Sequence, residues 1–348
     1  MARFLAWAGR QLGVVPPRPR EVQQNLDLRR ATDLAAGLVG QDSPRVDGAE
    51  LHALLTPQVQ RLFAAALEAD RIQVERRHRY DEGAGRDPDD FGGHLSRRAA
   101  SSGTGFPAAA LRRVEELLGF HVAVQESSIA GAGRGLFLKG RTKAGTVIAL
   151  YPGTVLLPGH IMQIPNVFDF LYPDDGHFLF SRYDGALIDA RGAAQPPLAP
   201  DEDAFRRHLH SHLFSEPMPT PARDNIFGVG HLSNHPPAGS APNAMMVGYD
   251  FESSMFRASA DDAESLASLI PNAYFRPPSL IRGTYSPTVM MQSVILLATR
   301  DLEDEEVLTD YRLSPNQERP AWYAPVDSEE ELRRWNEQAP VASSSVET

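Results

Sequence analysis

The chain carries the stretch Gly-Ala-Gly-Arg-Gly-Leu-Phe at residues 131–137, which decides how the rest of the sequence is interpreted. Glycines at alternate positions let backbone amides approach a ligand closely, because a Cβ there would clash or would forbid a positive φ. The residues that follow, Leu136-Phe137-Leu138, are typical of a strand. A strand in place of a helix, and the spacing of the third glycine, disfavour a Rossmann dinucleotide site. Taken alone, the segment is also consistent with a plain hairpin turn.

Two further polar segments follow in the chain. The first is Ser233-Asn234-His235, and the Pro236-Pro237 pair after it ends any regular element, so the Asn-His pair is expected at a turn where its polar groups can face a pocket. The second is the acidic run 304–311, which ends in Asp310-Tyr311. Without their context, the asparagine could simply satisfy its own backbone, and Tyr311 could be a buried tyrosine with one hydrogen bond.

In this order and spacing, the three segments resemble the S-adenosylmethionine-binding and catalytic motifs of SET-domain protein methyltransferases. Residues 143–155, and Phe178-Leu179-Phe180 followed by 184–189, are similar to the subgroup of SET domain-containing protein 9. The resemblance covers about residues 126–313. It implies an α+β, mainly β fold of several small β-sheets (a β-clip), with a pseudoknot-like C-terminal segment that threads under a loop so that the motifs meet.

The resemblance also implies an activity, S-adenosylmethionine-dependent protein-lysine N-methyltransferase, with a lysine side chain held in a narrow channel. Tyr311 would be the catalytic tyrosine, and Tyr151 would line the lysine channel. The residues implied in cofactor binding are Gly131, Ala132, Gly133, Arg134, Gly135, Asn234 and His235. Because the lysine pKa is near 10.4, an apolar channel that disfavours the ammonium would help the amine to deprotonate.

Two departures from the family pattern leave other functions open. Asn234-His235-Pro236-Pro237 replaces the usual Asn-His-Ser-Cys, and Asp304 replaces a glycine. The chain has no cysteine, so no zinc ligand of that kind is present and we expect no metal. Trp322 and Tyr323 are candidates to cover the channel instead. The alternatives are a non-catalytic SET-fold scaffold that binds a basic protein partner, and methylation of another nitrogen, such as that of histidine.

The composition of the chain limits the kinds of partner and cellular environment that are expected. With 348 residues and 42% hydrophobic content, the chain can bury a real core. A net charge of −11 disfavours direct nucleic-acid binding and suits a basic protein substrate. The resemblance implies that this substrate has an exposed lysine. No stretch reaches the roughly 18 apolar residues of a membrane span. The chain is therefore not expected to be an integral membrane protein. The compartment is not specified beyond an intracellular one, either cytoplasm, nucleus or mitochondrion, because the Arg-rich first 20 residues are either a mitochondrial presequence or a docked amphipathic helix.

Changes in composition and hydrophobic periodicity along the chain predict four parts. They are a helical N-terminal extension (1–70), a polar linker (71–105), the SET-like domain (106–315) and a partly disordered C-terminal segment (316–348). Two or three helices are expected in the extension, with breaks at Asp47 or Pro57. The Pro- and His-rich stretch at about 193–223 is interpreted as an insertion whose His208, His210 and His212 lie in a surface loop. A short helix is expected over Pro107 to Gly119, and short strands at 122–124, 136–138, 146–151, 178–180, 186–189 and 290–299.

Glu305 and Glu306 could be mistaken for an acid/base pair. Neighbours on a strand point to opposite sides. We expect these two carboxylates to hold a turn and to face solvent.

Overall fold

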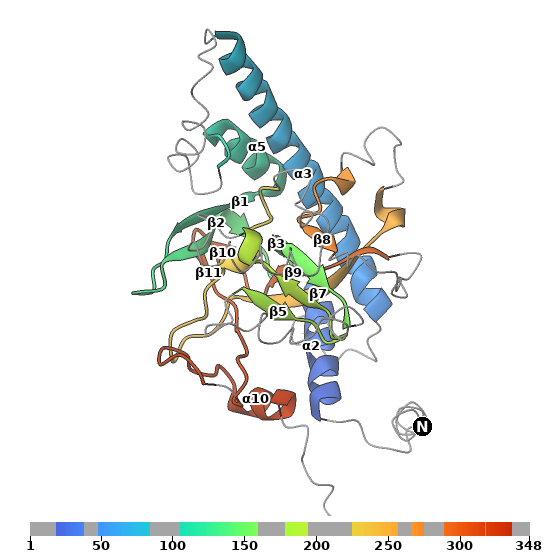
Figure 1. Ribbon diagram of the computed structural model, residues 1–348, viewed down its shortest axis with the longest axis vertical. Coiled ribbons are helices and arrows are strands. Elements are labelled where there is room, and N and C mark those ends of the chain that lie inside the picture. The colour runs from blue at the N-terminus through green and yellow to red at the C-terminus, as the bar shows by residue number, and fades with distance from the viewer. Residues whose placement is uncertain are drawn as a thin grey trace, which may run out of the picture.

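The computed structural model describes residues 19–37, 48–83, 105–158, 178–193, 225–256, 266–274, 289–316 and 318–335 (Figure 1). They form an α+β protein in which several small sheets are flanked by a few helices. The α-helices are α2 (Pro19–Ala35), α3 (Gly48–Gly83), α5 (Ala108–Leu118) and α10 (Ser328–Trp335). Single 3-10 turns are η2 (Arg191–Ala193), η3 (Gly230–Leu232) and η4 (Ser253–Phe256).

Helix α5 matches the sequence expectation at both ends. Pro107 at its N-cap has an extended backbone, and Gly119 at its C-terminus has a φ of 84°, which closes the helix through a bond from Gly119 N–H to Glu115 O. Proline suits the first helical turn and glycine the left-handed end, since neither then loses a needed bond or strains a Cβ.

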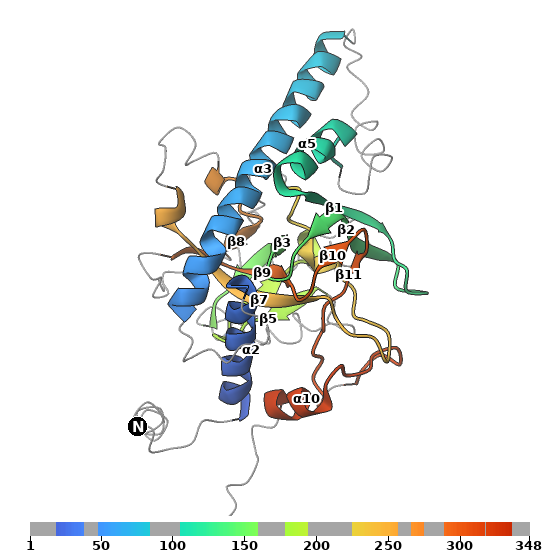
Figure 2. The same cartoon turned by 180° about the vertical axis from the view of Figure 1, so that it is seen from behind.

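The course of helix α3 differs from two expectations, the possible break at Pro57 and the start of the linker at residue 71. It runs without a break through Pro57, which lies exposed within it, and it continues through Arg71 to Gly83, into the segment expected as a linker. Apolar residues recur on one face over most of its length and bury Leu55, Val59 and Leu62, and this packing outweighs the polar texture near its end. Figure 2 shows α3 passing along the sheets and extending beyond them beside α5.

Three small sheets make up the rest. The first contains β1 (Phe120–Glu126), β2 (Arg134–Thr142), β10 (Leu302–Glu303) and β11 (Glu306–Val307), in the order β1-β2-β10 with β11 also on β2. The second has the order β3 (Val147–Tyr151), β9 (Val289–Ala298), β7 (Ala244–Glu252). The third has the order β5 (Leu179–Ser181), β6 (Leu187–Asp189), β4 (Gly153–Leu156), β8 (Asn272–Tyr274). Only β4 and β8 pair in parallel among these strands; the other pairs are antiparallel.

The N-terminal helices share one hydrophobic core with the first two sheets. Phe63 of α3 packs on Phe251 of β7, with ring centroids 5.5 Å apart. The Gln58 amide donates to Gly145 O at 3.0 Å and accepts from Val147 N–H at 2.9 Å, which fixes α3 at the start of β3. The helical extension is therefore part of the domain that carries the site.

The segment after β11 passes between the two ends of the loop 235–243. Leu308 forms a parallel bridge with Asn234, and Thr309 forms one with Ala244. Asn243 holds the crossing, because its side-chain oxygen accepts from Leu308 N–H at 2.7 Å and its amide donates to Glu306 O at 2.8 Å. This threading brings Asp310 and Tyr311 beside the Asn-His segment.

Several expectations fall outside the described residues. They concern the Arg-rich N-terminus, Asp47, most of the proposed linker, the His-rich insertion and the tail after Trp335. The described part of the C-terminal segment forms α10, which lies beside α2 in both views (Figures 1 and 2). No helix in the described ranges is both long and apolar enough to cross a membrane.

Candidate functional site

A cavity of about 2490 Å³ lies where the threaded segment meets the glycine turn. Its walls come from the glycine turn, the end of β3, η3, β7, the Asn-His segment and the C-terminal segment. Of the catalytic and cofactor-binding residues expected from the sequence, Gly133 and Gly135 do not line it; those that do are Gly131, Ala132, Arg134, Tyr151, Asn234, His235 and Tyr311. A space of this size exceeds that of a typical small-molecule pocket, and so has room for more than one ligand group.

The glycine turn opens into this cavity. Gly131 and Gly133 have φ values of 79° and 70°, and nothing lies within 4 Å of where their Cβ atoms would be. Gly135 is required for a different reason, because a Cβ there would lie 2.2 Å from Glu306 Oε1 and 3.1 Å from Asn234 Nδ2. The turn is thus free of side chains on one side and packed on a polar cluster on the other.

Glu306 is the centre of that cluster, and its position corrects the expectation that it faces solvent. Glu306 is only 6% exposed. One carboxylate oxygen accepts from Ser127 Oγ at 2.7 Å, and the other accepts from Ser128 N–H at 2.8 Å and Ser128 Oγ at 2.5 Å. Burial alone would raise the pKa of Glu306, but the hydrogen bonds from these serines and from Asn234 outweigh it and hold the pKa below its usual value.

Glu305 immediately precedes β11, and its side chain has different partners from those of Glu306. It pairs with Arg300 across a partly exposed surface and accepts from the Asn243 amide at 3.1 Å. The adjacent turn retains a left-handed backbone at Asp304, with a φ of 45°. The Asp304 carboxylate accepts from Gly140 N–H at 2.9 Å, so the replaced glycine changes only this turn.

Asn234 connects the Asn-His segment to the glycine turn. Its amide nitrogen donates to Arg134 O at 3.1 Å and to Glu306 Oε1 at 3.0 Å. Its backbone carbonyl accepts from Thr309 N–H at 2.9 Å. The asparagine therefore bonds across three segments rather than to its own backbone.

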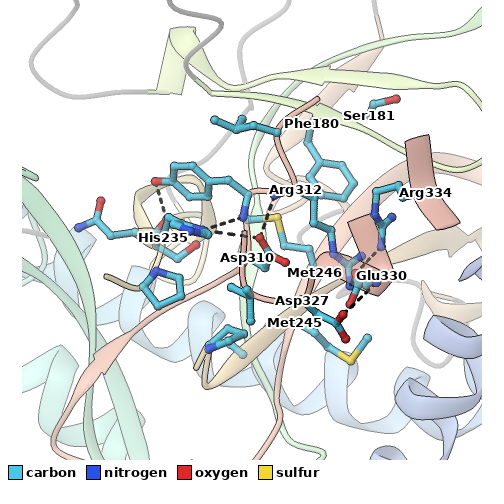
Figure 3. A pocket seen from close by; sticks show the side chains of 18 of the residues that line it. Phe180, Ser181, His235, Met245, Met246, Asp310, Arg312, Asp327, Glu330 and Arg334 are labelled. Atoms are coloured by element: carbon cyan, nitrogen blue, oxygen red, sulfur yellow. Dashed lines mark hydrogen bonds and ion pairs between the residues drawn. The ribbon is translucent and has the colours of Figure 1, made fainter. Parts of the chain in front are cut away.

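His235 is buried and joins Tyr311 to the C-terminal segment. Its Nδ1 lies 3.3 Å from Tyr311 N–H, and its Nε2 lies 2.8 Å from Ala324 O. These partners assign the proton to Nε2, since Nδ1 must accept. The ring also stacks on Tyr323 with centroids 4.6 Å apart, and Figure 3 shows Asp310 between His235 and Arg312.

Tyr311 extends its hydroxyl to the carbonyl of Ser233, donating at 3.1 Å. Burial raises its pKa to about 12, so the hydroxyl is neutral at physiological pH. Trp322 lies edge-on to the Tyr311 ring at 6.1 Å and is half exposed. Trp322 therefore lines this part of the cavity, and Tyr323, which is not among the lining residues, packs behind it on Trp322 and His235.

Tyr151, at the end of β3, is almost fully buried and faces the same space. Its ring packs on Phe180 at 5.7 Å. Burial, with smaller contributions from Tyr311 and Asp189, raises its pKa well above the usual value. Two neutral phenols thus face one cavity, Tyr151 from the end of β3 and Tyr311 from the segment after β11.

His231 lines the cavity as well, although sequence reasoning did not single it out. Neither of its ring nitrogens has a hydrogen-bond partner among the described residues. Burial first, and the Arg134 charge second, lower its pKa to about 4. Nothing in the sequence signals this, because a lone histidine in a Gly-His-Leu turn has no distinctive pattern.

An ionic cluster between α2 and α10 forms another wall of the cavity. Asp27 lies 3.1 Å from Arg312 and 3.2 Å from Arg334, while Glu330 accepts from both arginines (Figure 3). Burial would raise the pKa of Asp27, but Arg312, Tyr183 and Arg334 lower it overall. Ion pairs with largely buried side chains thus join α2 and α10 here, both directly and through Arg312.

The comparisons with known proteins gave matches among solved structures alone. None of the protein-family models compared with the chain matches it, and no curated protein matches it. One similar solved structure is a Plasmodium falciparum protein provisionally described as a histone methyltransferase, with 16% sequence identity and a TM-score of 0.24. The similarity covers 55% of this chain and 92% of that one. The functional argument therefore depends on the geometry of the site.

Proposed function

We propose that the chain is an S-adenosylmethionine-dependent protein-lysine N-methyltransferase of the SET-domain type, related to the subgroup of SET domain-containing protein 9. One observation carries the proposal: the threaded crossing at Leu308 and Thr309 joins the glycine turn, the Asn-His segment and Tyr311 around one cavity. The motif resemblance requires this convergence, and segments that matched by chance would have no reason to meet.

The cofactor's chemistry suits the residues around the glycine turn. S-adenosylmethionine, when bound, supplies a methyl group activated by a sulfonium. The open backbone at Gly131 and Gly133 leaves space that a Cβ would occupy, and Arg134 offers a positive charge beside it. Asn234 and Glu306 would keep this turn in a fixed position, so the cofactor would meet a preformed site.

The two tyrosines would act as neutral hydroxyls. The raised pKa values of Tyr311 and Tyr151 exclude phenolate as a resting form at neutral pH. Methyl transfer needs an aligned, uncharged amine rather than a covalent nucleophile. Tyr311 would orient groups at the channel floor, and Tyr151 with Phe180 would form an apolar wall that disfavours the ammonium.

The proposal is tested by transfer of a tritiated methyl group from S-adenosylmethionine to poly-L-lysine and to core histones. We expect incorporation by the wild-type protein and a loss of about 100-fold or more in Tyr311→Phe, the scale of a lost transition-state donor. Tyr249→Phe is the matched control, because it also removes a buried hydroxyl, bonded to Thr56 Oγ1, from a residue that does not line the cavity.

Each result has a defined meaning. Equal transfer by wild type and Tyr311→Phe would remove Tyr311 from the mechanism. Labelled histidine in the hydrolysed product would replace lysine as the acceptor. Absence of both cofactor binding and transfer would favour a scaffold that binds a basic partner.

A further inference from the structure

His231 is held in a fixed position by its turn. A Cβ on the preceding Gly230 would lie 2.8 Å from Leu150 O and from Leu296 Cδ1, so η3 packs directly on β3 and β9. The histidine ring lies edge-on to Phe178 at 5.7 Å and to Tyr151 at 6.4 Å. Its side chain therefore enters the cavity between two aromatic rings.

Both ring nitrogens of His231 are without a partner in the described parts of the chain, although the residue is only 6% exposed. Leaving a buried polar atom unpaired is unfavourable, and most such groups in folded proteins find a donor or acceptor. His231 is among the residues that line the cavity, which places these unpaired nitrogens at its wall.

The ring is also uncharged. Burial and the Arg134 charge lower its pKa to about 4, so at neutral pH one nitrogen keeps a free lone pair. The charged and titratable groups that influence it are Arg134 from β2 and the neutral Tyr151 from β3. A neutral imidazole at this place can accept a hydrogen bond from a ligand N–H.

The surroundings favour an amine on an apolar stem. The Tyr151 and Phe178 rings can pack against methylene groups on either side of the imidazole. The positive charge of Arg134 disfavours an ammonium nearby, and so favours the neutral form of the amine that a methyl acceptor must adopt.

We propose that His231 accepts a hydrogen bond from the side-chain amine of the substrate lysine and holds it between Tyr151 and Phe178. The identity of the substrate rests on the proposed function, whereas the acceptor itself rests on the geometry of His231. In this role His231 contacts the substrate and aligns the amine; it takes no proton, since its basicity is too low.

Binding is measured first, without reference to activity. The full chain, labelled with ¹⁵N in histidine and saturated with S-adenosylhomocysteine, is titrated with Nα-acetyl-L-lysine methylamide and with its norleucine analogue, which lacks the amine. His231 resonances are assigned by their loss in His231→Phe. We expect a saturable shift with the lysine compound alone; no shift, or equal shifts with both compounds, would overturn the proposal.

Kinetics with poly-L-lysine separate this inference from the proposed function. His231→Phe retains a ring of similar size, so the unfolding temperature and cofactor binding should be kept while kcat/KM falls about 10- to 100-fold. His231→Gln or His231→Asn, which each restore one acceptor, should recover most of the loss, and His121→Phe on the remote strand β1 should have no effect. Unchanged transfer in His231→Phe would overturn the inference and leave the proposed function standing. If no protein binds cofactor or transfers methyl, the proposed function fails, and the same titration without S-adenosylhomocysteine decides the role of His231: a shift with the lysine compound alone supports it, and no shift overturns it.

Discussion

Replacing Glu306 by glutamine tests whether one buried carboxylate holds the glycine turn and Asn234 together. Glu306 accepts four hydrogen bonds, from Ser127 Oγ, Ser128 N–H, Ser128 Oγ and Asn234 Nδ2. The serine hydroxyls can rotate, but the Ser128 N–H and the Asn234 amide lie on opposite oxygens and can only donate. A glutamine amide group must therefore face one of them, which leaves a buried donor unpaired and removes the charge from the remaining bonds.

From these contacts we expect Glu306→Gln to lower the free energy of unfolding by about 2–3 kcal/mol, the scale of one unpaired buried donor plus weakened charged bonds. Glu305→Gln is the matched control: its ion pair with Arg300 is partly exposed, so about 0.5–1 kcal/mol is expected. Urea unfolding at pH 7, followed by circular dichroism, measures both values. An equal or larger loss in Glu305→Gln would refute the role given to Glu306.

The same carboxylate gives a pH signature. Because its folded pKa lies below the usual 4.5, Glu306 stabilises the protein above that pH, and this contribution is lost as pH falls through the lowered value. Wild type should therefore lose more stability than Glu306→Gln on acidification below about pH 4.5. An equal loss of stability on acidification in wild type and Glu306→Gln would contradict the lowered pKa assigned to Glu306.

Three other predictions follow from the site. Gly135→Ala places a Cβ 2.2 Å from Glu306 Oε1 and should weaken S-adenosylmethionine binding at least about tenfold by calorimetry, whereas Gly48→Ala, with open space around it, should not. His231 has a folded pKa of about 4 against 6.5 unfolded, so it should cause stability to fall by about 3 kcal/mol from pH 6.5 to 4. Measured by urea unfolding at the two pH values, His231→Phe should lose about 3 kcal/mol less free energy of unfolding than wild type. Tyr323→Ala removes the ring stacked on the Asn-His histidine at 4.6 Å and should speed hydrogen exchange in residues 318–326, whereas Tyr323→Phe should not.

Local signals in the sequence predict much of the fold. Pro107 and Gly119 mark both ends of α5, and the β-branched run 146–151 predicts β3 to within one residue of Val147–Tyr151. Proline at position 57 predicts a break that does not occur, because its ring lies on the exposed face while the opposite face of α3 packs on the sheets. Tertiary packing here outweighs a local rule.

The site is less predictable, because its parts are joined by long-range contacts. Alternation on a strand already implies that Glu305 and Glu306 cannot both face solvent, and the structure shows Glu306 as the buried one. Its partners Ser127 and Ser128 lie near the start of the predicted domain 106–315, whereas Glu306 lies near its end. The unpaired nitrogens of His231 likewise emerge only when β3 and η3 are packed together.

Calorimetric titration with S-adenosylmethionine tests the central claim most directly, because it requires no known substrate. Three proteins are compared: wild type, Asn234→Ala, which removes the link between the turn and the Asn-His segment, and Asn225→Ala, which removes similar hydrogen bonds away from the cavity. Saturable binding by wild type and Asn225→Ala, with at least about tenfold weaker binding by Asn234→Ala, is the predicted result. Absence of binding by all three, or equal binding by all three, would contradict the cofactor site proposed for this chain.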